Sequence, residues 1–179
     1  MNLLIRAVQI IDASSPFHLQ IKDILVKDGI IVSIRHHIDA DWETEIFNAE
    51  GMSVSPGWFD LYAHLCDPGY EYKEDIVSAS KAAAAGGFTG IAALPDTKPV
   101  IDSKSGIEYI LNKARGQIVD IFPIGAVTKG CEGKELAEMY DMAAAGAIAF
   151  SDAQHPIAEA GLMMRGLLYV KKIGSVIIH

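Results

Sequence analysis

Five short runs of branched apolar residues, separated by polar and turn-forming residues, occupy the first 55 positions of the chain. Strands are predicted for these runs, which cover residues 3–11, 21–27, 30–35, 45–47 and 52–54. Asp28-Gly29 lies between the second and third runs, where it favours a β-hairpin because such a turn needs positive φ. The pattern predicts a small antiparallel sheet or β-sandwich over residues 1–55.

From residue 58 onward, apolar runs alternate with segments of helical periodicity. The predicted strands are residues 58–64, 89–94, 120–126, 147–150 and 175–179. The predicted helices between them are residues 75–85, 103–113, 134–145 and 157–173. Successive strands begin 27 to 31 residues apart, a spacing typical of parallel strands joined by right-handed helical crossovers.

Two α/β architectures contain such repeats, a doubly wound sheet and a (β/α)8 barrel. The first strand-to-helix turn, residues 65–74, contains one glycine and neither a GxGxxG motif nor a P-loop, so a dinucleotide-binding sheet is disfavoured. A complete (β/α)8 barrel usually needs about 250 residues. We therefore expect residues 56–179 to form the first half of a TIM-type barrel, beside the N-terminal β-sandwich strands, in a sequence that looks truncated.

Composition removes several classes of function. The chain has 15 Lys and Arg against 23 Asp and Glu, a formal net charge of −8, which disfavours nucleic-acid and anionic-membrane partners. Its longest uncharged apolar run, residues 142–150, is about half the 18 residues that a membrane span needs. Two cysteines and no signal peptide indicate a reducing, cytoplasmic setting.

Polar residues follow the predicted barrel strands at their carboxyl ends, where barrel enzymes place their active sites. The first strand ends in Asp60-Leu61-Tyr62-Ala63-His64, and side-chain alternation places Asp60, Tyr62 and His64 on one side. Later strands end near Asp96, Asp152 and His179.

These strand ends carry a resemblance to a known family. Residues 55–69, SPGWFDLYAHLCDPG, resemble the PGxxDxHxHxREPG signature of the dihydroorotase family of the amidohydrolase superfamily. AAAAGGFT at 82–89, LPDTKP at 94–99 and AFSD at 149–152 are similar to further segments of that family, in the same order. The resemblance implies a barrel carrying a β-sandwich, with zinc at the strand ends. It also implies dihydroorotate ring chemistry in pyrimidine biosynthesis.

The chain departs from the family pattern at the site itself. Tyr62 replaces one histidine of HxH, Cys66 replaces the substrate-binding arginine, and Asp96 replaces the substrate-binding asparagine. The last two changes make the site more negative by two charges, opposite an anionic substrate. The resemblance leaves His64, Asp152 and His179 as tentative metal ligands.

Each tentative ligand has an alternative role. His64 is either a surviving ligand or a histidine hydrogen-bonded in the barrel mouth, and Asp152 is either a ligand or the cap of the next helix. His179 depends on the strand register, and His155 is either a compensating ligand or a loop residue in solvent. We expect no metal on His64 in this chain, Tyr62 to fill part of the metal space, and Cys66 to be an inert thiol.

Two functions follow from the resemblance and the departures. The first is a noncatalytic dihydroorotase homologue that acts as a structural partner of aspartate carbamoyltransferase in a homo- or hetero-oligomer, with no cofactor. The alternative is an active zinc-dependent dihydroorotase, or another cyclic-amide hydrolase, with a rearranged metal site. The alternative requires zinc to be bound in the full-length protein.

Overall fold

A computed structural model describes residues 2–179, which divide into two compact units, one ending at Pro56 and the other beginning at Gly57. The first unit is one five-stranded sheet. Its strands are β1 (Asn2–Ile10), β2 (Ile21–Lys27), β3 (Ile30–Arg35), β4 (Glu45–Asn48) and β5 (Ser53–Val54). The order is β3-β2-β1-β4, and β5 also pairs with β1.

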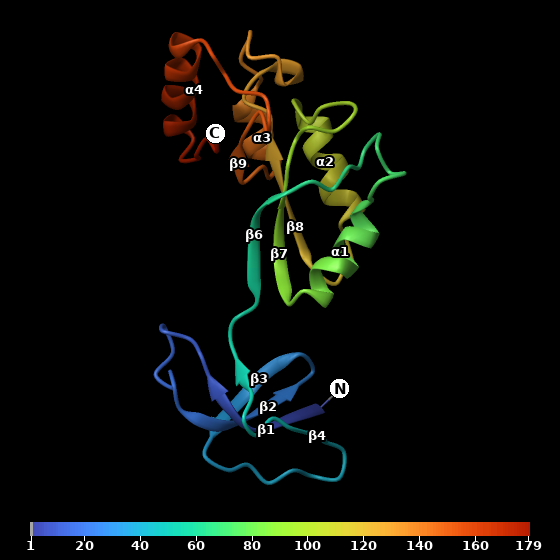
Figure 1. The fold of residues 1–179 in the computed structure, drawn as a ribbon, viewed down its shortest axis with the longest axis vertical. Helices are drawn as coiled ribbons and strands as arrows, with labels where there is room; N and C mark the ends of the chain where they lie inside the picture. The colour runs from blue at the N-terminus through green and yellow to red at the C-terminus, as the bar shows by residue number, and fades with distance from the viewer. Residues whose placement is uncertain (1) are drawn as a thin grey trace. The chain divides into compact units, whose positions relative to one another are not determined.

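The sheet of this unit is mixed, which corrects the expectation of an antiparallel sheet. β1 pairs with β2, and β2 with β3, in antiparallel fashion, whereas β4 and β5 both pair with β1 in parallel. The parallel pairs arise because residues 36–44 carry the chain across the sheet before β4 begins (Figure 1). Val8, Ile10, Ile24 and Ala49 form the buried core of this unit.

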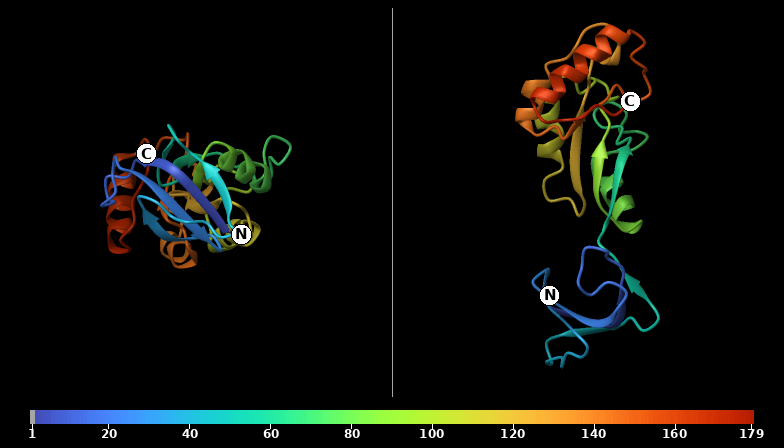
Figure 2. Two further views of the ribbon diagram at one scale, coloured as in Figure 1. Left: turned by 90° about the horizontal axis from the view of Figure 1, so that it is seen from below. Right: turned by 90° about the vertical axis from the view of Figure 1, so that its left-hand side faces the viewer.

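The second unit contains a four-stranded parallel sheet in the order β6-β7-β8-β9. The strands are β6 (Trp58–Ala63), β7 (Phe88–Ala93), β8 (Asp120–Gly125) and β9 (Ala149–Phe150). Figure 2 shows β6 and β7 side by side and pointing the same way. The half-barrel sheet that was predicted is confirmed.

Helices join these strands in the expected alternation. They are α1 (Ile76–Ala85), α2 (Lys104–Lys113), a 3-10 turn (Lys129–Cys131), α3 (Met139–Ala145) and α4 (Ala160–Lys172). α1 begins with a capping box in which Asp75 and Ser78 satisfy each other's backbone amides, and α2 begins after Ser103. Of the helices within residues 2–179, none has the length and apolar character to cross a bilayer.

Several predicted elements are shorter in the structure, three of them at the C-terminal end of the chain. α3 starts at Met139 rather than at residue 134, because Leu136 bridges Thr128 and the Ala137 amide bonds to Val127. α4 starts at Ala160 rather than at residue 157. The strand predicted at 175–179 is reduced to a bridge between Ile177 and Phe150, since β9 itself has only two residues to offer.

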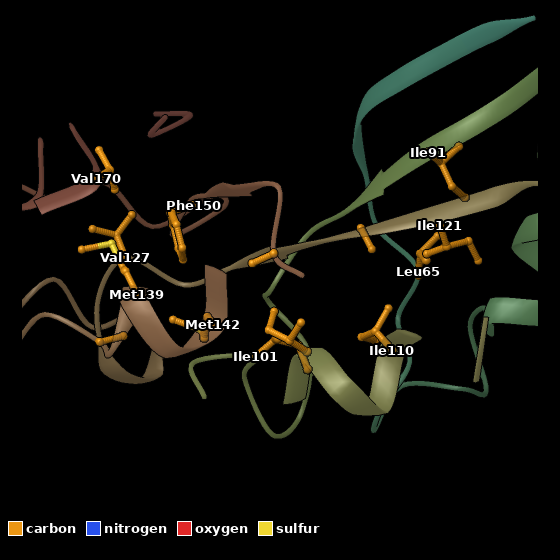
Figure 3. Close-up of a cluster of buried hydrophobic side chains, with 14 of the residues drawn as sticks. Leu65, Ile91, Ile101, Ile110, Ile121, Val127, Met139, Met142, Phe150 and Val170 are labelled. Carbon is orange, nitrogen blue, oxygen red and sulfur yellow. The ribbon is translucent and has the colours of Figure 1, made fainter. Parts of the chain in front are cut away.

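The core of the second unit lies between the sheet and its helices (Figure 3). Met139, Met142 and Phe150 are fully buried in it. Leu65, two residues beyond the end of β6, is also buried there, at 3% exposure. Its burial fixes the point at which the chain leaves β6 and enters the segment that carries the candidate site.

Candidate functional site at the strand ends

His64 connects the ends of three strands. Its Nδ1 lies 3.0 Å from Oδ2 and 3.2 Å from Oδ1 of Asp96, which follows β7. Its Nε2 lies 3.4 Å from the side-chain nitrogen of Gln154, which follows β9. Both ring nitrogens of His64 therefore have a polar neighbour within the chain, and the imidazole is 38% exposed.

Tyr62 lies beside His64, as the side-chain alternation predicted. The two rings meet edge to face with centroids 5.9 Å apart, and Tyr62 is 41% exposed. Asp60 faces back into the strand, where its Oδ1 accepts a hydrogen bond from the Tyr62 amide at 2.9 Å. The register of β6 against β7 is irregular between Asp60 and Ala63. Of these two residues, Tyr62 is thus the one in contact with the His64 ring.

Asp152 is buried and bonded to a different part of the chain. Its Oδ1 accepts hydrogen bonds from the amides of Val127 and Thr128, at 2.8 and 2.9 Å, and its Oδ2 accepts one from the Thr128 hydroxyl. The residue is only 3% exposed. It does not cap the next helix, because Glu159 does so. The carboxylate thus holds the turn after β8 in place.

The remaining tentative site residues are scattered. His179 and His155 are both exposed, and Cys66 is half-buried with φ of 59°. Among residues 2–179, no three or more His, Cys, Asp and Glu side chains come together in a way that could hold a metal ion. The roles of His64, Asp152 and His179 as metal ligands stay predictions.

The pKa of a second cysteine, Cys131, is affected by carboxylates near the strand ends. Cys131 is 5% exposed, and burial raises the pKa of its thiol to about 12, with the carboxylates of Asp152, Asp96 and Asp102 adding to the rise. Three carboxylates therefore act on one buried thiol. Of the three, Asp96 stands where the family pattern has an uncharged asparagine.

Two further residues contribute to this region. Gln154 was not predicted as a contributor, and its only signal in the sequence is that it follows the strand end at Asp152. Thr128 follows the predicted strand at residues 120–126, so its position at a strand end was predictable, whereas its bonding partners were not. Its hydroxyl donates a hydrogen bond to Asp152, which lies 24 residues away in the sequence, and accepts one from the Gly133 amide. No sequence motif links Thr128 to either residue.

Comparison with known proteins adds to this geometry. The dihydro-orotase-like family matches residues 51–179. The dihydroorotase of Citrifermentans bemidjiense is 45% identical over 179 residues, and that of Ruminiclostridium cellulolyticum is 41% identical. Each comparison covers 99% of this chain but 42% and 41% of the relative, respectively, so the chain spans less than half of either protein.

Solved structures of the amidohydrolase superfamily share the fold. The L-hydantoinase of Arthrobacter aurescens superposes with a TM-score of 0.80 at 22% identity, covering 98% of this chain and 39% of that one. The D-hydantoinase of a Thermus species gives 0.74 at 26% identity, covering 98% and 39%. A dihydroorotase structure gives 0.66 at 14% identity, covering 98% and 50%. The family match extends over more than two thirds of the sequence, and on that ground the chain belongs to the dihydroorotase-like family.

Proposed function

We propose that this protein serves pyrimidine biosynthesis as a noncatalytic dihydroorotase-like subunit and structural partner of aspartate carbamoyltransferase. Family membership and relatives named dihydroorotase support the pathway. The observation that carries the noncatalytic role is the separation of the tentative ligands into different hydrogen-bond sets. His64 is engaged by Asp96, while Asp152 is engaged by the turn at residues 127–128.

The side chains at the strand ends differ from those that bind a catalytic zinc ion. A catalytic zinc ion needs about three protein ligands that converge on it from imidazole, thiolate or carboxylate groups. Asp152 already accepts three hydrogen bonds, and at the HxH position the chain offers a phenol, Tyr62, in place of a neutral imidazole. The described residues therefore do not fit a zinc site.

The charge of the site also supports a role without dihydroorotate chemistry. Relative to the family pattern, Cys66 removes a positive charge and Asp96 adds a negative one. A charge-assisted hydrogen bond contributes roughly 1.5–3 kcal/mol, so the missing arginine alone weakens binding of a carboxylate by about one to two orders of magnitude.

The experiment measures metal, ligand and partner in the full-length protein. We expect elemental analysis to find far less than one zinc per chain, and calorimetry to detect no micromolar binding of dihydroorotate. Size-exclusion chromatography with purified aspartate carbamoyltransferase should give a joint peak. Stoichiometric zinc with turnover, or no joint peak, would contradict the proposal.

One observation favours the second candidate, an active zinc-dependent dihydroorotase or related cyclic-amide hydrolase. A carboxylate on one nitrogen of an imidazole commonly orients the other nitrogen toward a metal, and Asp96 stands in that relation to His64. Under this candidate, a zinc ion would supply an activated water. Asp96→Asn should then lower zinc affinity about tenfold or more. The noncatalytic role predicts no loss, because there is no bound zinc to lose.

A further inference from the structure

The segment that leaves β6 is anchored, outside the strand-end site, by an ion pair between a buried carboxylate and a partly exposed lysine. Asp67 is completely buried, and its Oδ2 lies 2.6 Å from Nζ of Lys113, in the last turn of α2. Its Oδ1 accepts a hydrogen bond from the Tyr109 hydroxyl at 2.8 Å, and Lys113 also donates to that hydroxyl at 3.0 Å. Asp67 thus receives two donors from successive turns of one helix.

Two further contacts hold the same segment from other directions. The Ile76 amide, at the start of α1, donates to Oδ2 of Asp67 at 3.3 Å. The Lys98 amide, in the loop after β7, donates to the Pro68 carbonyl at 2.9 Å. Gly69 has φ of 92°, and a Cβ there would collide with the Lys98 carbonyl, so the two loops approach as closely as glycine allows.

Cys66 lies between the two buried residues of this segment. Leu65 packs in the core, and Asp67 is buried and paired with Lys113. Cys66 itself is half-buried and has a positive φ. A non-glycine residue in that conformation is held by its surroundings, because the left-handed region is unfavourable for it. The contacts of Asp67 are the strongest constraint next to it.

From these contacts we infer that Lys113 is a positioning residue for the strand-end site. It acts through Asp67 to fix residues 65–70, and so holds Cys66 beside His64 in one orientation. The inference rests on the proposed function only in treating these strand ends as the site. Asp67 and the Tyr109 hydroxyl raise the pKa of Lys113, which agrees with a cation held against a carboxylate.

Removing the lysine that pairs with a buried carboxylate leaves that carboxylate without compensation. In Lys113→Met, the Asp67 carboxylate would have to remain buried beside a methionine or move into water. Moving into water pulls residues 65–70 away from α2. The segment then opens locally while the rest of the unit stays folded, as happens when a single anchoring contact is lost from a loop.

The two cysteines provide the measurement. Iodoacetamide is added to the whole protein at one fixed pH, and peptide mass spectrometry follows each thiol separately. Cys66 reports on the segment, while Cys131, at 5% exposure, reports on opening of the whole unit. We expect Lys113→Met to raise the alkylation rate of Cys66 about tenfold or more and to leave the rate of Cys131 unchanged. Lys113→Arg keeps the charge and should restore a slow rate.

The control is Lys104→Met, which removes a lysine of the same helix from an exposed pair with Glu108 at 3.7 Å and should change neither rate. If Lys113→Met does not fold, Tyr109→Phe keeps the ion pair, removes the two hydrogen bonds of that hydroxyl and should give a smaller rise at Cys66 alone. An unchanged Cys66 rate, or equal rises at both thiols, would overturn the inference. Zinc or dihydroorotate binding would overturn the proposed function and leave these rates as they are.

Discussion

Asp96 and His64 form a carboxylate–imidazole pair across the ends of two neighbouring strands, with 3.0 Å between Oδ2 and Nδ1. The carboxylate exists because the chain has Asp where the family pattern has Asn. The pair therefore joins a residue that the chain retains to one that it has changed. The imidazole, which in the family would serve a metal, here has a charged neighbour of its own.

Restoring the two substrate-binding positions should restore affinity for the family's substrate. Cys66→Arg adds one positive charge to the strand ends, and Asp96→Asn removes one negative charge. We expect dihydroorotate affinity, measured by calorimetry, to rise about tenfold or more, because the arginine can bind a carboxylate through two hydrogen bonds. As a control for net charge, Cys66→Arg is combined with Asp120→Asn at the exposed start of β8. Equal affinities in the two double variants would show that Asp96 has no role.

Replacing Tyr62 should strengthen zinc binding. In Tyr62→His a second imidazole stands next to His64, where the rings are now 5.9 Å apart. We expect the zinc affinity of the full-length protein to rise about tenfold or more, as for other changes in the ligand environment of a metal. The matched control is Tyr140→His on the exposed surface of α3. Stoichiometric zinc before the substitution, with a bond of about 2.0–2.1 Å to His64, would show instead that the site is intact.

Much of the architecture could be predicted from local signals. Asp28 and Gly29 have φ of 50° and 78°, as the Asp-Gly turn requires, and the observed bounds of β2 and β3 match the predicted ones. The repeated strand–helix spacing also gave the parallel sheet. Pairing between distant short strands was not accessible, because four residues at 45–48 contain no signal for direction. β4 could therefore lie parallel to β1 without any trace in the sequence.

The sequence could predict which residues of the site lie close together, but not which of their atoms form bonds. Strand order brings the residues after β6 and β7 together, so the proximity of His64 to Asp96 follows from the fold. Which atoms bond depends on rotamers and on donors that the pattern does not reveal. Asp152 illustrates this, because its partners are two backbone amides at residues 127 and 128, and every residue type except proline offers such a donor.

The bonds of Asp152 predict a large cost for changing it. Asp152→Asn replaces a charged acceptor of three hydrogen bonds by an amide with one acceptor oxygen. We expect the free energy of unfolding, from urea titration, to fall by about 2–4 kcal/mol, since a buried bond to a charged group contributes about 1.5–3 kcal/mol. Asp120→Asn, at an exposed carboxylate, should change it by less than about 0.5 kcal/mol. A loss at Asp152 as small as the control would show that the carboxylate does not hold the turn.

The buried thiol of Cys131 predicts a loss of stability at alkaline pH. Burial, and the nearby carboxylates after it, raise the thiol pKa from 9.0 to about 12 in the folded chain. Above pH 9 the unfolded chain releases this proton while the folded chain keeps it. Since the unfolded state then binds fewer protons, the free energy of unfolding falls by about 1.4 kcal/mol per pH unit from this group. The contribution is fully present below pH 9 and is lost toward pH 12.

Urea titrations at pH 8, 9 and 10 measure this slope, and Cys131→Ala isolates the thiol's share of it. The variant removes the titrating group, so its free energy of unfolding should fall less steeply above pH 9 than that of the unchanged protein. Cys66→Ala is the matched control, because that thiol is only half-buried, and it should keep the steep slope. If the slopes of the Cys131→Ala variant and the unchanged protein coincided, the Cys131 thiol would have to ionise equally in the folded and unfolded chains. The three carboxylates would then have no measurable effect on it.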